Sequence, residues 1–271
     1  MRLALTVEYD GRGFCGWQRQ KDVPSVQQAL EEALSSLANH DVRVICGGRT
    51  DTGVHALMQV VHFDTHAVRP WRGWVYGTNT RLPAGVAVTG VHTVPDDFHA
   101  RFSATSRRYH YHILAHPVRS ALWRGRALWE CRNLDLAAMQ DAASRLLGEH
   151  DFSSFRGQGC QARHPVRNIT HVTLRQRGYL LTLEIEANAF LMHMVRNIVG
   201  VLLDIGLGRA KPDWVDELLT VCDRTQGGVT APADGLYLAA IRYPGHFGVQ
   251  PGGPGYALDA LLRTSDPDTA G

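Results

Sequence analysis

The chain has 271 residues, of which 44% are hydrophobic and 20% charged, and its formal net charge is only +2. This balance excludes a disordered chain and is typical of a globular protein with a sizeable buried core. The five cysteines have no paired spacing, no apolar run is long enough to span a membrane, and no leader-like segment precedes the first strand. We therefore expect reduced thiols and a cytoplasmic protein without a membrane partner.

The first half of the chain predicts alternating strands and one helix. A strand over 3–9 leads into a glycine-rich connection at 10–20, and Ser25 with Gln28 forms a capping box. From there to residue 37, apolar side chains recur at helical spacing, which predicts a helix with one buried face. Further strands are expected near 42–46, 58–63 and 86–94.

The loop between two of these strands, Gly-Gly-Arg-Thr-Asp-Thr-Gly at 47–53, presents the carboxylate of Asp51 among glycines. Glycine lets a backbone approach a ligand closely, and a loop held by buried strands displays a reactive side chain rigidly. Arg49 stands two residues away, which favours an ionised Asp51 that acts as a nucleophile. A surface turn in which Asp51 bonds its own backbone explains the same residues.

The second half repeats the alternation. We expect strands near 109–114, 168–176, 180–187 and 236–243, and helices near 134–147, 190–207 and 212–222. The chain is therefore predicted to be an α+β protein with two halves, 1–104 and 105–245, that flank a ligand cleft. A Gly/Pro-rich tail follows at 246–271.

Arginine is concentrated in two windows without any acidic residue, 98–129 and 155–179. Because arginine binds phosphates and stacks on bases, these windows favour a polyanion-binding face over an ordinary solvated surface. Arg196 stands in the most apolar helix, where a charge is seldom left unpaired, and Asp51 is a suitable partner. The alternative is that Arg196 reaches solvent at the helix end.

Eight short blocks occur in order along the chain: YDG with GWQRQ, GRTDTGVH, QVVHF, DFHARFSA, RYHY, DFSSF, NAF with HMVRN, and GLYL. In these blocks, from about residue 2 to 245, the chain resembles the TruA-type tRNA pseudouridine synthases. The resemblance implies the pseudouridine synthase fold, with mainly antiparallel sheets flanking a basic cleft. It also implies a homodimeric isomerase without cofactor or metal, which converts uridines 38, 39 or 40 of the tRNA anticodon stem-loop to pseudouridine.

The resemblance also implies roles for individual residues. Asp51 is the nucleophile, Tyr109 stacks on the target base, and Arg196 is the basic partner of Asp51. Arg49 fills the space left by the flipped nucleotide. The implied tRNA contacts are Arg69 and two stretches, Phe98, His99, Ala100, Arg101 and Phe102, and Gly159, Cys160, Gln161, Ala162 and Arg163. Pro117 stands where relatives can carry a basic residue, which puts one backbone contact in doubt.

The chemistry agrees with these roles. The reaction moves C1′ from N1 to C5 of the uracil without oxidation or reduction, and the base must first leave its stack. Asp51 can attack C1′, attack C6 or abstract a sugar proton, and the sequence does not separate these routes. His62 and His66 have a metal-like spacing but lie around a strand end, so no metal site is expected. The alternative function is a non-catalytic tRNA-binding protein with the same basic cleft.

Overall fold

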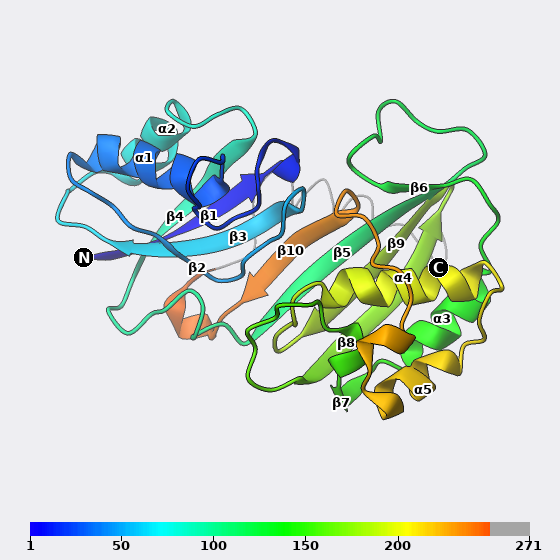
Figure 1. Ribbon diagram of the computed structural model, residues 1–271. Helices are drawn as coiled ribbons and strands as arrows, with labels where there is room; N and C mark the ends of the chain where they lie inside the picture. The colour runs from blue at the N-terminus through cyan, green and yellow to red at the C-terminus, as the bar shows by residue number, and fades with distance from the viewer. Residues whose placement is uncertain (250–271) are drawn as a thin grey trace, which may run out of the picture. The chain divides into compact units, whose positions relative to one another are not determined.

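The computed structural model describes residues 1–249, which form two compact units (Figure 1). Unit 1 comprises residues 1–105 together with 238–249, and unit 2 comprises Ser106–Tyr237. The expected halves place the last strand in the second half, whereas in the structure that strand groups mostly with unit 1. Of the expected tail, 250–271 lies outside the described residues, and Gly245–Phe247 form one 3-10 turn.

The sheet of unit 1 has the strand order β4-β1-β3-β10, and a short β2 also pairs with β3. The strands are β1 (Arg2–Tyr9), β2 (Ile45–Cys46), β3 (His55–Asp64), β4 (Val86–Val94) and β10 (Leu236–Arg242). β1 runs antiparallel to both neighbours, with Leu5 opposite Val61 and Val91. The expected strand at 42–46 is reduced to two residues, whereas β3 begins three residues earlier than expected.

Two helices, α1 (Val26–Ala38) and α2 (Trp71–Asn79), lie together on one face of this sheet (Figure 1). Ser25 caps α1 by accepting a hydrogen bond from the Gln28 N–H at 3.3 Å. The second half of the predicted capping box is wrong, because the Gln28 side chain donates to Glu32 instead. The apolar stripe of α1 is confirmed, since Leu30 and Leu34 are fully buried, and each contributes about 1.5–3 kcal/mol by burial. α2 was not expected.

The sheet of unit 2 has the order β5-β9-β8-β7, with every neighbouring pair antiparallel. Its strands are β5 (Ser106–Ala115), β7 (Gly148–Asp151), β8 (Val166–Arg177) and β9 (Leu180–Ala187), and a short β6 (Leu128–Glu130) runs parallel to β5. The predicted α+β class with mainly antiparallel sheet is confirmed. The short strands β6 and β7 were not expected.

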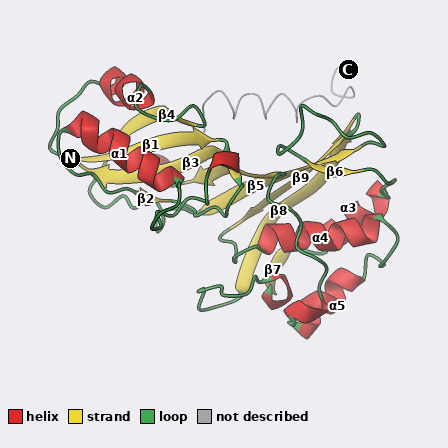
Figure 2. Ribbon diagram, turned by 45° about the horizontal axis from the view of Figure 1, so that its top comes forward, coloured by secondary structure: helices red, strands yellow, loops and turns green. Residues whose placement is uncertain are grey.

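The helices of unit 2 are α3 (Leu136–Ser144), α4 (Met194–Gly206) and α5 (Trp214–Val221), and α3 lies beside α4 (Figure 2). α4 begins four residues later than expected because His193, just before it, has a left-handed backbone with φ 59°. Within the described residues, no helix is both long and apolar enough to cross a membrane.

Candidate active site

The loop that carries Asp51 connects β2 to β3, and hydrogen bonds fix its first residues to β3. The Gly47 N–H donates to the Val60 carbonyl at 2.8 Å. The side chain of Gln59 bonds both backbone groups of Gly48, accepting from its N–H at 3.2 Å and donating to its carbonyl. These contacts attach the loop to the buried strand β3, so the backbone before Asp51 has little freedom to move.

The residues next to Asp51 are held equally closely. The Thr50 hydroxyl lies 2.7 Å from the hydroxyl of Tyr9, and both side chains are buried. The Asp51 carbonyl accepts from the Val54 N–H at 3.1 Å, so the backbone turns between these two residues. Asp51 itself is half-buried, and Arg49 is exposed. The loop is a turn, but one anchored in the core of unit 1.

The glycine-rich connection at 10–17 lies directly behind this loop. The Trp17 N–H donates to the Thr50 carbonyl at 3.0 Å, and Trp17 is 1% exposed. Gly16 has φ +86°, and a Cβ there would lie 2.8 Å from the Thr50 oxygen and 3.2 Å from the Asp51 carbonyl carbon. A Cβ on Gly11 would lie 2.1 Å from the Val54 oxygen. Glycine is required at both positions because the two backbones touch.

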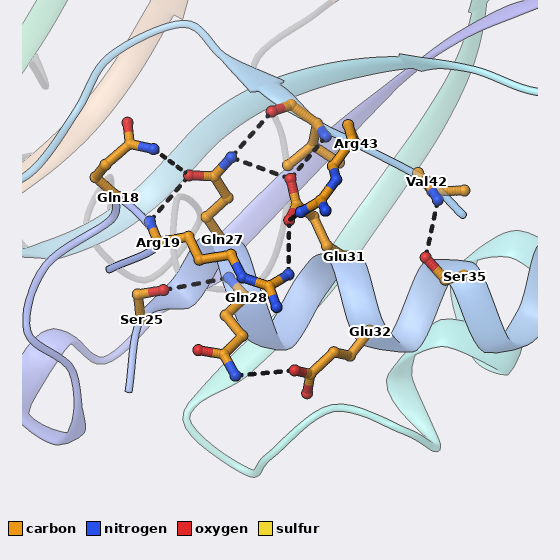
Figure 3. Close-up of polar contacts among 11 residues, drawn as sticks. Gln18, Arg19, Ser25, Gln27, Gln28, Glu31, Glu32, Ser35, Val42 and Arg43 are labelled. Carbon is orange, nitrogen blue, oxygen red and sulfur yellow. Dashed lines mark hydrogen bonds and ion pairs between the residues drawn. The ribbon is translucent and has the colours of Figure 1, made fainter. Parts of the chain in front are cut away.

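A buried carboxylate connects Arg19, near the end of this glycine-rich connection, to the segment just before β2 (Figure 3). Glu31 of α1 is 2% exposed and pairs with Arg19 at 3.3 Å and Arg43 at 3.0 Å. It also accepts from the Gln27 side chain at 3.0 Å and from the Val44 N–H at 3.2 Å. Glu31 thereby holds three separate chain segments together around the base of the loop.

Cys46 comes directly before the loop and is a second residue type that can act as a nucleophile. Burial raises the pKa of its thiol to about 12, although Arg49 opposes that effect. A thiol with so high a pKa is protonated at neutral pH and is a poor nucleophile. Of Cys46 and Asp51, the Asp51 carboxylate is therefore the candidate nucleophile.

The expected tRNA-contact stretch Phe98–Phe102 also belongs to unit 1 and divides into anchors and exposed groups. Phe98 and Ala100 are fully buried, and the Ala100 N–H donates to the His62 ring at 3.1 Å. Phe102 is 76% exposed; the His99 ring stacks on it at 4.3 Å, and the Arg101 guanidinium lies 5.5 Å from the Phe102 ring centroid. His99, Arg101 and Phe102 are therefore the members that present groups to solvent.

His62 anchors this stretch as a neutral ring. Burial lowers its pKa to about 4, and the nearby His99 and Arg2 contribute in the same direction. The ring nitrogen that accepts from Ala100 is the one that protonation would occupy. His66 stacks instead on His40 at 4.2 Å, and among residues 1–249 no group of three or more potential ligands is placed to hold a metal.

Unit 2 carries Tyr109 and Arg196. Tyr109, on β5, is 9% exposed and meets the Phe190 ring edge-to-face at 5.1 Å. Arg196, on α4, donates through Nε to the Ala231 carbonyl at 2.7 Å, and its own carbonyl accepts from the Ala231 N–H at 3.1 Å. Arg196 is therefore held at least partly by the chain that crosses α4, and it is half-buried.

The stretch Gly159–Arg163 also lies in unit 2, where Arg156 shapes it. The Arg156 guanidinium donates to the carbonyls of Cys160 and Ala162. Burial alone would raise the pKa of Cys160, but hydrogen bonds from Ala162, Met192 and Arg156 bring it below its ordinary value. Gln161 and Arg163 are exposed, as is Gly159 at φ +79°.

Not every arginine of the basic windows is free to bind a polyanion. Arg108 pairs with Glu184 at 2.6 Å and with Glu186 at 2.5 Å on the neighbouring strand β9. Arg69 lies outside these windows, just before α2; it is exposed, and it donates to the backbone carbonyls of Val68 and Leu37. The supporting residues Gln59 and Glu31 were missed by sequence reasoning. Gln59 lies within the QVVHF block of the resemblance. The sequence does not indicate which residues Gln59 and Glu31 bond, because those partners lie in other segments of the chain.

Comparison with known proteins gives consistent similarities over almost the whole chain. A sequence profile described as tRNA pseudouridine synthase matches residues 5–103 and 142–244. A protein named tRNA pseudouridine synthase A from Hydrogenovibrio crunogenus is 51% identical over 260 residues, covering 96% of this chain and 98% of that protein. Proteins of the same name from Vibrio cholerae and Methylococcus capsulatus are 50% and 49% identical, covering 96% and 99% of this chain and 100% and 99% of theirs.

Proposed function

The chain belongs to the tRNA pseudouridine synthase family, and on that premise we propose that it isomerises uridine to pseudouridine at positions 38, 39 or 40 of tRNA anticodon stem-loops. The observation that carries the proposal is the Asp51 loop, in which a half-buried carboxylate stands on a backbone held by β3, Tyr9 and the glycine-rich connection. A reactive group so fixed has little freedom to leave its productive geometry.

Asp51 acts on the flipped nucleotide as the nucleophile. The glycosidic bond between C1′ and N1 breaks, the uracil turns, and C1′ bonds to C5, from which a proton is then lost while N1 gains one. The atoms and electrons balance within the substrate, so no hydride acceptor is consumed. Attack at C1′, attack at C6 and removal of a sugar proton all start from the carboxylate form of Asp51.

The other proposed roles follow the family's motif residue by residue. Tyr109 stacks on the target base and recovers part of the cost of unstacking it, at about 1–3 kcal/mol per base. Arg49 occupies the gap in the RNA stack, and Arg196 is the basic partner of the Asp51 carboxylate. The phosphate and loop contacts come from Arg69, Arg101 and the exposed groups of the stretches 98–102 and 159–163.

We further propose that the enzyme works as a homodimer on tRNA in the cytoplasm, as the resemblance to its family implies. The stretch 98–102 supports a nucleic-acid surface because its exposed groups are an arginine and two stacked rings, a combination that suits both phosphates and unstacked bases.

The direct test is release of tritium from tRNA labelled at uridine C5, because formation of the new bond expels that hydrogen. Wild-type protein is expected to release tritium, and Asp51→Ala is expected to release none while it still binds tRNA. Asp51→Asn is the shape-matched variant and is expected to fail equally. Release by Asp51→Ala at the wild-type rate would remove Asp51 from the reaction, and binding without release by the wild type would leave a non-catalytic tRNA-binding protein.

A further inference from the structure

α2 carries two exposed aromatic rings that lie near each other, and a guanidinium that lies against one of them. Trp71 is 57% exposed and Tyr76 58%, and their ring centroids lie 6.0 Å apart. The Arg72 guanidinium lies 5.5 Å from the centroid of the Trp71 ring. We call Trp71, Arg72 and Tyr76 the α2 patch. The helix packs into the core through Trp74, which is 2% exposed, so the α2 patch is not needed to fill the core.

The surroundings of the α2 patch on the chain are basic. Residues 65–95 contain no aspartate or glutamate, and they contain Arg69, Arg72 and Arg81, all exposed. Arg69 donates to backbone carbonyls, and Arg81 donates to the Ser36 hydroxyl, the Thr80 hydroxyl and the Gly77 carbonyl. Within residues 1–249, none of the three has a carboxylate at ion-pair distance. Arg72 lies beside the Trp71 ring, and the three guanidiniums together leave positive charge for an external anion.

The charge and the side-chain chemistry of the α2 patch together indicate which kind of molecule binds it. Aromatic faces with arginine beside them bind unstacked bases, while guanidiniums bind the flanking phosphates. A second copy of this chain docked symmetrically through the same face would set these arginines against one another, which disfavours a two-fold contact. An RNA strand supplies both the π-face and the negative charge that the patch lacks.

We propose that the α2 patch is an RNA-binding site, at which an unpaired base of the tRNA stacks on Trp71 while Arg69 and Arg72 bind its flanking phosphates. The inference rests on the proposed function in that tRNA is the RNA bound. It adds a second base-stacking position to the one proposed for Tyr109, and it places that position on α2 of unit 1.

The test measures the dissociation constant of labelled, unmodified tRNA for wild type, Trp71→Ala, Trp71→Phe and Arg72→Ala. Trp71→Ala is expected to weaken binding about tenfold, the size of one lost stacking contact, and Trp71→Phe to restore most of it. Arg72→Ala is expected to lower the slope of log affinity against log salt by about one. Trp214→Ala is the matched control, because Trp214 is a partly exposed tryptophan beside Asp213, Asp216 and Glu217, and it should bind as wild type does.

Two further readouts make the result decisive. Ultraviolet cross-linking of bound tRNA, followed by peptide mapping, is expected to label the peptide with Trp71 and Tyr76. Thermal unfolding shows whether each variant keeps the native fold. The inference is overturned if Trp71→Ala folds natively and binds tRNA with wild-type affinity. It is also overturned if the variant loses the dimer but keeps its affinity for tRNA. Tritium release by the wild type is scored separately, so failure of the proposed function is distinguishable from failure of the patch.

Discussion

Replacing Gly16 by alanine tests whether the glycine-rich connection positions Asp51. Gly16 has φ +86°, and an alanine at a left-handed position costs about 1–2 kcal/mol. The new Cβ would also lie 2.8 Å from the Thr50 oxygen, whereas ordinary contact begins at 3.4 Å. Relief of that overlap moves the backbone at Thr50 and Asp51 by roughly half an ångström. Since a 1 Å misplacement can cost about a hundredfold in rate, we expect the rate constant of the chemical step to fall about tenfold.

The matched control is Gly178→Ala in the turn between β8 and β9. Gly178 also has a left-handed backbone, at φ +57°, but a Cβ there meets nothing within 4 Å. Both variants therefore carry the cost of the left-handed alanine, and only Gly16→Ala carries the clash. Tritium release under single-turnover conditions measures the rate, thermal unfolding measures stability, and tRNA affinity shows that substrate still binds. Equal rates for the two variants would refute the argument that Gly16 positions Asp51.

Three other predictions follow from the same structure. Glu31→Gln removes the charge that pairs with Arg19 and Arg43. Since these guanidiniums can return to water, we expect the free energy of unfolding to fall by only about 2 kcal/mol. The control Glu32→Gln, at an exposed neighbouring residue, should change the free energy of unfolding little. Tyr109→Leu should lower turnover by about 5- to 150-fold, the equivalent of one stacking contact, and affect tRNA affinity far less; an unchanged rate would exclude Tyr109 from base stacking. The pKa of His62 is about 4 in the folded protein and near 6.5 in the unfolded chain. Its contribution to the free energy of unfolding is therefore complete above pH 6.5 and is lost as the pH falls toward 4. Urea unfolding should show this decline, up to about 3 kcal/mol, and His62→Gln should lack it.

The sequence predicted those helices and strands in which apolar residues recur at regular spacing. The stripe of α1 and the strand β4 were readable because one face of each is more buried than the other. β1 was expected from its alternating pattern, although in the structure it is buried on both faces. α2 was missed because Gly73 and Gly77 interrupt a nine-residue helix and weaken its helical signal. The start of α4 was placed too early because apolar residues precede His193, whose left-handed backbone prevents a helix there.

The sequence predicted the loop of the candidate site but not the residues that hold this loop in place. The glycines and Asp51 stand together in one segment, so their pattern is visible along the chain. Gln59 reaches back to Gly48, and Glu31 joins Arg19 to Arg43, contacts that exist only after the chain has folded. Sequence order carries no signal for such pairs, since each partner is an ordinary polar residue in its own segment.

The return of the chain to unit 1 has a consequence for biosynthesis. β10 lies beside β3, yet the ribosome makes it only after the whole of unit 2. The start of β10 follows the end of β3 by 172 residues, so at about 5–20 residues per second the edge of β3 waits roughly 9 to 34 seconds for its neighbour. During that interval the nascent chain exposes an unpaired strand edge, which is a template for wrong pairing. Unit 1 therefore completes its sheet only after unit 2 has been synthesised, and a chain truncated before Leu236 lacks the strand that covers this edge.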